Sequence, residues 1–273
     1  MRIARFSHEG STSFGVVEGP GADPADLVVA GIDGHPFGRF TFTGERHPLA
    51  AVRLLAPVLP SKVVCIGKNY ADHVAEMGGS QPPADPVTFL KPSTSVIGPG
   101  DPIMLPRNST HIDHEAELAI VIGRLCRDVP SAKAADVILG YTCGNDVTAR
   151  DHQKADGQWT RGKSHDSFCP IGPWIETDLD ARDLAVQCFV DGEIRQDGRT
   201  SSLLHGIGEV IEWVTAFMTL LPGDVIRDGP PAGVGPMIPG NPVPALVAGI
   251  GPLPTPGGLR RASAAAVRPR RRA

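Results

Sequence analysis

The stretch His111-Ile112-Asp113-His114-Glu115-Ala116-Glu117-Leu118-Ala119-Ile120-Val121-Ile122-Gly123 decides the fold, because it joins two carboxylates to an apolar strand. Residues 118–122 form a nearly continuous aliphatic run, which is typical of a strand buried on both faces. Residues two apart on a strand project to the same face, so Glu115 and Glu117 are predicted to point side by side. Two adjacent carboxylates repel each other unless a proton or a cation lies between them.

A third carboxylate follows the next apolar segment. Residues 137–145 again have the composition of a strand, and Asp146 comes directly after them. If the two strands are neighbours, Glu115, Glu117 and Asp146 meet at their ends. An all-oxygen set of this kind suits a hard divalent ion, Mg²⁺ or Mn²⁺ rather than Zn²⁺.

Several ordered motifs resemble the fumarylacetoacetate hydrolase family, almost without gaps from about Lys62 to about Gly235. The matching stretches are Val64-Cys65-Ile66-Gly67-Lys68-Asn69-Tyr70-Ala71-Asp72-His73, Phe89-Leu90-Lys91-Pro92, His114-Glu115-Ala116-Glu117-Leu118, Gly140-Tyr141-Thr142-Cys143-Gly144-Asn145-Asp146-Val147-Thr148-Ala149-Arg150-Asp151, Gly162-Lys163-Ser164 and Leu221-Pro222-Gly223-Asp224-Val225-Ile226. The resemblance implies that Glu115, Glu117 and Asp146 are metal ligands. It also implies an α+β, mostly β fold: a mixed β-sandwich roll with a small N-terminal β-rich domain.

Three regions are predicted along the chain. Residues 1–56 alternate short β-like runs with glycine-rich turns, which indicates the small β-rich domain. Residues 62–256 form the expected catalytic domain. Within it, Asp191-Gly192 predicts a hairpin turn, and Ile207, Val210, Ile211, Val214, Phe217 and Met218 predict the apolar stripe of a helix. Residues 257–273, which end in an arginine cluster, are expected to be a disordered basic tail.

Composition excludes several classes of protein. The chain has 273 residues and a net charge of −4, but residues 229–273 contain six arginines and no lysine or acid, so the preceding part carries −10. This acidic body offers no electrostatic surface for nucleic acid. We find no signal peptide and no apolar segment long enough for a membrane, so a cytoplasmic protein is expected. The five cysteines are scattered and are interpreted as reduced core residues.

His73 and Glu76 lie three residues apart in a short segment that ends at Gly78-Gly79. On one helical turn the two side chains share a face and can touch. The family resemblance implies that this segment closes over the metal and that the His-Glu pair positions and activates water. Such a short helix, between glycine-rich and proline-rich ends, is suited to being a mobile lid.

Further site residues come from the same resemblance. Three carboxylates around a dication leave a charge of −1, and an anionic substrate adds to it, so a nearby ammonium is needed; Lys163 is the best candidate. The resemblance also implies substrate contacts for Lys91, Asn69, Tyr70 and Gly229.

The resulting hypothesis is a metal-dependent enzyme of small 2-oxo or dicarboxylic acids that works through a metal-stabilised enolate. Hydrolysis of acylpyruvate or fumarylpyruvate-type carbon–carbon bonds is the leading reaction. Isomerisation of 2-hydroxyhepta-2,4-diene-1,7-dioate and decarboxylation of oxaloacetate stay open, as does a catalytically impaired protein that only binds its ligand. No organic cofactor is expected, and the family resemblance implies a homodimer.

One segment departs from the family pattern. Relatives usually have Leu-Thr-Gly-Thr-Pro after the Pro-Gly-Asp-Val-Ile turn, and the second threonine binds the substrate carboxylate. Here the run is Arg227-Asp228-Gly229-Pro230-Pro231. Pro230 brings neither a hydroxyl nor a backbone N–H to that position, and Asp228 adds a negative charge. Weak activity toward 2-oxo acids is therefore expected, with the defect mainly in substrate binding.

Overall fold

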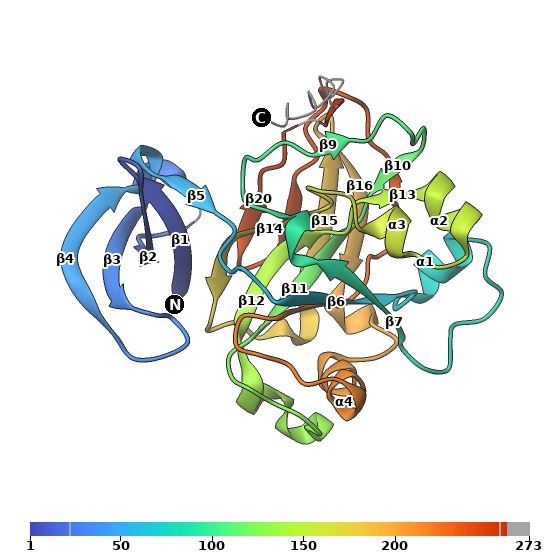
Figure 1. Cartoon of the computed structure of the whole chain (residues 1–273), viewed down its shortest axis with the longest axis horizontal. Helices are drawn as coiled ribbons and strands as arrows, with labels where there is room; N and C mark the ends of the chain where they lie inside the picture. The colour runs from blue at the N-terminus through green and yellow to red at the C-terminus, as the bar shows by residue number, and fades with distance from the viewer. Residues whose placement is uncertain (22, 257, 261–273) are drawn as a thin grey trace, which may run out of the picture.

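The protein is mostly β, and short helices lie against a long twisted sheet. The computed structural model describes residues 1–21, 23–256 and 258–260. Figure 1 shows a small N-terminal β unit, in blue, beside a larger body that contains all the labelled helices. The α+β, mostly β class that the sequence predicts is confirmed.

The N-terminal unit is an antiparallel meander. Positive φ angles at Glu9 and Gly10 close the first turn, and β5 adds to β1 from the other side. Arg2 and Ile3 pair with residues of β14, so the unit continues the sheet of the body. Its strands are β1 (Arg2–His8), β2 (Ser11–Glu18), β3 (Val28–Gly34), β4 (Phe40–Pro48) and β5 (Arg53–Leu55).

The apolar residues that follow Glu115 form β11 (Ala116–Ile122), a strand inside that sheet. The strand order is β4-β3-β2-β1-β14-β12-β11-β17-β6-β7, with β11 antiparallel to both of its neighbours and β17 parallel to β6. All seven residues of β11 are buried, as the aliphatic run predicts. The strands of the body are β6 (Lys62–Gly67), β7 (Val87–Pro92), β11 (Ala116–Ile122), β12 (Ile138–Asn145), β14 (Cys169–Glu176) and β17 (Val225–Arg227).

A second, smaller sheet packs against one face of β11 and makes the body a sandwich. Its order is β16-β15-β19-β20, and Asp191 and Gly192, both at positive φ, form the predicted hairpin turn. Val186 and Val247 of this sheet share one core cluster with Leu118 of β11. Its strands are β15 (Ala185–Val190), β16 (Glu193–Arg199), β19 (Ala245–Val247) and β20 (Gly251–Leu253).

Four α-helices surround the sheet in the described part of the chain. The helix α4 covers Ile120 and Ile226 with Val210, Ile211 and Val214, which confirms the core of the predicted stripe. Phe217 is 50% exposed, so its assignment to that stripe was wrong; it is the last residue of the helix. No helix among the described residues is long and apolar enough to cross a membrane. The helices are α1 (Ala71–Glu76), α2 (Arg150–Asp156), α3 (Thr160–Lys163) and α4 (Ile207–Phe217).

The remaining strands are short pieces at the edges of the body. Pro236 and Pro252 lie in two of the C-terminal strands. Because proline has no backbone N–H to donate to a neighbouring strand, these strands stay short. The predicted disordered tail lies outside the described residues, except that Leu259–Arg260 pair with β9 as β21. The short strands are β8 (Val96–Ile97), β9 (Met104–Leu105), β10 (Ile112–His114), β13 (Thr148–Ala149), β18 (Gly235–Pro236) and β21 (Leu259–Arg260).

Candidate metal centre and active site

The ends of β11 and β12 bring the three predicted ligands together. Ala116 pairs with Asn145, the Glu115 N–H donates to Asn145 Oδ1 at 2.8 Å, and the Asp146 N–H donates to the Glu115 carbonyl at 2.8 Å. One ligand oxygen from each of Glu115, Glu117 and Asp146 lies within 4.8 Å of the others. All three residues are at most 2% exposed, so the carboxylates converge away from bulk water.

Buried cations surround the triad. Lys163 Nζ lies 2.7 Å from both Glu115 Oε2 and Asp146 Oδ2, and Lys91 Nζ lies 2.5 Å from Asp146 Oδ1. Arg150 pairs with Glu115. Lys163 therefore lies beside the triad, and its role in the reaction stays a prediction.

The charges around each carboxylate set the direction of its pKa. Burial acts to raise the pKa of Asp146, but Lys163 and Lys91 outweigh burial and hold it well below its usual range. Burial likewise opposes ionisation of Glu115, and Arg150 and Lys163 lower its pKa. Glu117 differs: burial raises its pKa, and its neighbouring cation, Arg227, only opposes the rise. Two members of the triad are thus held as carboxylates by the protein itself.

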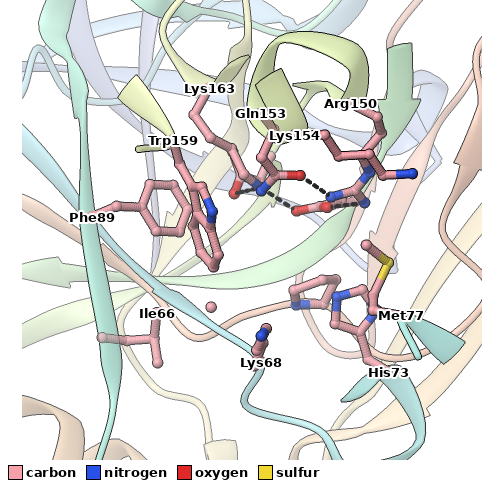
Figure 2. Close-up of a pocket in the computed structure, with 14 residues that line it drawn as sticks. Ile66, Lys68, His73, Met77, Phe89, Arg150, Gln153, Lys154, Trp159 and Lys163 are labelled. Carbon is pink, nitrogen blue, oxygen red and sulfur yellow. Dashed lines mark hydrogen bonds and ion pairs between the residues drawn. The ribbon is translucent and has the colours of Figure 1, made fainter. Parts of the chain in front are cut away.

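A cavity of about 270 Å³ opens onto Glu115 and Asp146. Figure 2 shows other residues around this cavity, among them His73, Trp159 and Lys163. Phe89 and Trp159 form an aromatic wall, with ring centroids 5.2 Å apart. Basic side chains also border the cavity, namely Lys68, Arg150, Lys154 and Lys163. Lys163 Nζ lies 5.0 Å from the centroid of the Phe89 ring. Two of these cations, Arg150 and Lys163, are buried beside the carboxylates. Carboxylates and cations around one cavity suit a small anion that also ligates a divalent ion.

The predicted His73–Glu76 pair lies on α1 and borders the same cavity. His73 Nδ1 is 3.2 Å from Glu76 Oε2, and the Gly233 N–H donates to Glu76 Oε1 at 2.9 Å. When Nδ1 donates to Glu76, Nε2 carries the lone pair and can accept a proton. His73 is only 5% exposed, so its ring meets the cavity and little bulk water.

The four predicted substrate contacts lie behind the cavity wall. The Asn69 amide donates to the carbonyls of His205 and Asp228, at 3.0 and 2.9 Å, and fastens two loops together. Gly229 has a φ of +95°, and a Cβ there would lie 2.8 Å from the Ile66 carbonyl. Lys91 and Tyr70 are at most 1% exposed. None of the four residues is among those that line the cavity. Direct contact between them and a substrate stays a prediction.

Two residues of the divergent segment lie in different places. Pro230 borders the cavity, whereas Asp228 is buried and accepts a hydrogen bond from the Leu118 N–H at 3.0 Å. Burial raises the pKa of Asp228. Because its carboxylate does not line the cavity, the structure gives no contact through which Asp228 would repel a substrate.

Several site residues were not assigned from the sequence. Arg150 is the first residue of α2 and comes four residues after Asp146. This nearness in sequence to a predicted metal ligand was the signal from which Arg150 could have been assigned to the site. Lys154 lies one turn further along the same helix. Trp159 reaches the cavity because Gly67 has no side chain; a Cβ there would lie 2.5 Å from the indole. That contact joins segments far apart in sequence, and no local pattern indicates it.

Asp151 anchors the start of the helix that carries Arg150. It accepts hydrogen bonds from Ser109 Oγ at 2.7 Å, from the Thr110 N–H at 2.9 Å and from the His152 N–H at 3.0 Å. Burial acts to raise the pKa of Asp151, but these hydrogen bonds outweigh it and lower the pKa to about 2.

Asp151→Asn is expected to lower the free energy of unfolding by about 1 kcal/mol at pH 7, after allowance for solvent screening. A depressed pKa stabilises the fold above the unfolded-state value near 3.8. That stabilisation is lost as the pH falls toward 2. Urea unfolding at pH 7 and at pH 3 should therefore show a smaller difference between variant and parent at the lower pH. The exposed Asp178→Asn is the matched control, and an equal difference at both pH values would contradict the assignment.

Comparisons with known proteins agree with this geometry. Residues 62–256 match the family described as "Fumarylacetoacetate (FAA) hydrolase C-terminal", and residues 1–57 match "Rv2993c-like, N-terminal". Protein Rv2993c of Mycobacterium tuberculosis is 57% identical over 94% of this chain and 97% of its own. The match assigns the chain to a class of β-sandwich enzymes, and the structure shows a buried acidic triad at its strand ends. Within that class, the chain belongs to the fumarylacetoacetate hydrolase family.

Two solved structures show the range of activities among its relatives. The 2-hydroxyhepta-2,4-diene-1,7-dioate isomerase from Mycobacterium marinum is 52% identical, with a TM-score of 0.89, over 96% of this chain and 99% of that one. Maleylpyruvate hydrolase from Sphingobium sp. SYK-6, solved with manganese(II) and pyruvate, is 30% identical, with a TM-score of 0.76, over 96% of this chain and all of that one. Relatives of this chain are thus enzymes of more than one reaction type.

Proposed function

We propose that this chain is a divalent-metal-dependent enzyme that hydrolyses carbon–carbon bonds of acylpyruvate or fumarylpyruvate type. The observation that carries the proposal is the convergence of Glu115, Glu117 and Asp146, because Glu115 and Asp146 line a cavity that His73 also borders. A non-hydrolytic isomerase of 2-hydroxyhepta-2,4-diene-1,7-dioate type is the alternative, and the similarity to the Mycobacterium marinum isomerase supports it about as well.

The donor set fits a hard divalent ion. Three carboxylate oxygens within 4.8 Å of one another suit Mg²⁺ or Mn²⁺, and the related hydrolase holds manganese(II). Such an ion supplies Lewis-acid polarisation of a 2-oxo carboxylate. No organic cofactor is needed for that chemistry.

The cavity favours a small, multiply charged acid. Lys68 and Lys154 border it and can hold a carboxylate, while Phe89 and Trp159 can pack against an unsaturated chain. A volume of about 270 Å³ suits a substrate with few carbons. These features support a 2-oxo dicarboxylic or acylpyruvate-type acid.

His73 is proposed as the general base of hydrolysis. With Nδ1 donating to Glu76, its Nε2 accepts a proton from a water held at the cavity, and Glu76 stabilises the imidazolium that forms. Lys163 and Arg150 balance the negative charge of the triad and the substrate. Isomerisation needs proton transfer but no water nucleophile, so the same residues can serve both reactions.

The test uses the full chain loaded with Mg²⁺ or Mn²⁺. Oxaloacetate, acetylpyruvate and fumarylpyruvate are each added, and loss of substrate absorbance is followed while products are identified by chromatography. Turnover of acetylpyruvate or fumarylpyruvate to pyruvate supports the hydrolase. Product that is an isomer of its substrate supports the alternative, and binding without turnover supports a catalytically impaired protein. A homodimer is proposed on the family resemblance and is checked by light scattering.

Pro230→Thr is expected to raise kcat/KM by roughly ten- to 150-fold, mainly through KM. Pro230 borders the cavity, and threonine there would add a hydroxyl and a backbone N–H for a substrate carboxylate. A hydrogen bond to a charged group contributes about 1.5–3 kcal/mol. Steady-state kinetics decide the matter, with Pro230→Val as the control that restores the N–H without the hydroxyl. No gain from threonine over proline would show that this position does not bind the carboxylate.

A further inference from the structure

The Arg227 side chain lies beside Glu117, in a space bordered by small residues of the neighbouring strands β11 and β12. Arg227 pairs with Ala119 on β11, and Glu117 lies two residues before Ala119 and projects on the same face. Gly144, opposite Glu117, has no side chain, and a Cβ there would lie 2.8 Å from Arg227 Cζ. The small residues at 119 and 144 thus provide the volume that the guanidinium fills.

The Arg227 guanidinium forms an ion pair with one proposed metal ligand, Glu117. Arg227 Nε lies 2.7 Å from Glu117 Oε2, and the two residues are 0% and 1% exposed. Nη1 makes only a long contact to Cys169 Sγ at 3.8 Å, and Nη2 is buried without a hydrogen-bond partner among the described residues. Since nothing else in this environment balances its charge as closely, Arg227 depends on Glu117.

When all four of its carboxyl groups are ionised, the charge of the whole cluster is already balanced without an ion. Four carboxylates pair with four cations, and five of the six oxygens of the triad accept a hydrogen bond from one of these cations. The carboxylates are Asp113, Glu115, Glu117 and Asp146, and the cations are Lys91, Arg150, Lys163 and Arg227. A divalent ion therefore enters a neutral cluster, in which its attraction to three carboxylates is opposed by four nearby positive charges.

We propose that Arg227 is an intramolecular competitor of the divalent ion for Glu117 and thereby sets a low metal affinity. Lys163, Lys91 and Arg150 contact Glu115 or Asp146, so Arg227 is the cation placed on the third ligand. An ion that binds Glu117 must share this carboxylate with the guanidinium or displace it. Arg227 is a positioning residue, and it acts through Glu117. This inference rests on the proposed metal site.

The test measures Mn²⁺ binding to the chelator-stripped full chain by isothermal titration calorimetry. Arg227→Leu and Arg227→Gln remove the charge, and the glutamine keeps a hydrogen bond within reach of Glu117. Both are expected to tighten the Kd for Mn²⁺ by about ten- to a hundredfold. Arg227→Lys keeps the charge and is expected to bind Mn²⁺ as weakly as the parent, which a purely steric role would not produce.

Thermal unfolding provides the second measurement. Without Arg227 the Glu117 carboxylate is buried unpaired, so the neutral variants should melt at a lower temperature than the parent when stripped and gain more from added Mn²⁺. Unchanged Mn²⁺ affinity in both neutral variants would overturn the proposal. So would neutral variants that fail to fold even with Mn²⁺, because an ion that competes for Glu117 should replace its partner.

A control separates this inference from the proposed metal site. Glu117→Gln in the parent background should lose Mn²⁺ binding. If it binds Mn²⁺ as the parent does, the triad is not the metal site and both proposals fail. If it loses Mn²⁺ while the Arg227 variants are unchanged, the metal site stands and only the competition is refuted.

Discussion

Asp146→Asn is expected to lower Mn²⁺ affinity by at least about a hundredfold and to abolish metal-dependent turnover. Mutating the outer partners of metal ligands already costs about ten- to a hundredfold. Asp146 is one of the three oxygen ligands proposed among the described residues, so its loss should cost more. The substitution is nearly isosteric, so the cavity keeps its shape. Calorimetry with Mn²⁺ and a turnover assay on the same preparation give the two readouts.

The same variant should also lose stability, because Asp146 balances two buried ammonium groups. Lys91 is 0% exposed and Lys163 is 3% exposed, and both contact Asp146. Breaking a buried pair by removing one partner costs about 3–5 kcal/mol. Thermal unfolding of the stripped protein would report this loss directly.

Asp156→Asn is the matched control for that experiment. Asp156 makes the same kind of carboxylate–cation pair, with Arg161, but at the exposed end of α2. It should leave Mn²⁺ affinity, turnover and the unfolding temperature unchanged. If Asp146→Asn and Asp156→Asn bind Mn²⁺ equally well, Asp146 is not a ligand.

Local sequence patterns predicted the part of the site that depends on strand geometry. The aliphatic run after Glu117 required a buried strand, and the two-residue repeat then placed Glu115 and Glu117 on one face. The prediction that Asp146 lies beside these two residues needed only that consecutive strands pair, which is their usual arrangement. His73 and Glu76 touch for an equally local reason, since one helical turn separates them.

The remaining features depend on contacts between distant segments. Arg227 reaches Glu117 because β17 pairs with β11, an association across more than a hundred residues that no local pattern contains. Trp159 enters the cavity through the space beside Gly67, for the same reason. Phe217 fits the apolar period of α4, yet it is the last residue of the helix and is half exposed. Periodicity identifies a face of an element, but tertiary packing decides how far that face is covered.

His73→Ala is expected to lower the rate of hydrolysis by about 10²–10⁴-fold, the usual contribution of a general acid or base. Mn²⁺ binding should be unchanged, because His73 lies outside the triad and contacts Glu76 instead. Decarboxylation of oxaloacetate needs no water nucleophile, so it should fall much less than hydrolysis of acetylpyruvate.

The ratio of the two losses tells what the His73–Glu76 pair does. A base that activates water affects hydrolysis alone, whereas a helix that merely closes the cavity affects every reaction inside it. Glu76 also accepts from the Gly233 N–H at 2.9 Å, so the pair connects α1 to the loop after Pro230 and a closing role is a real competitor. His73→Gln separates the two further, because glutamine can keep a hydrogen bond to Glu76 but cannot take a proton at neutral pH. Assays of both variants, with His8→Ala on β1 as the control, should show equal loss of hydrolysis in the alanine and glutamine variants. Recovery of hydrolysis by glutamine, or equal loss of hydrolysis and decarboxylation, would assign the pair to closure of the cavity instead of to proton transfer.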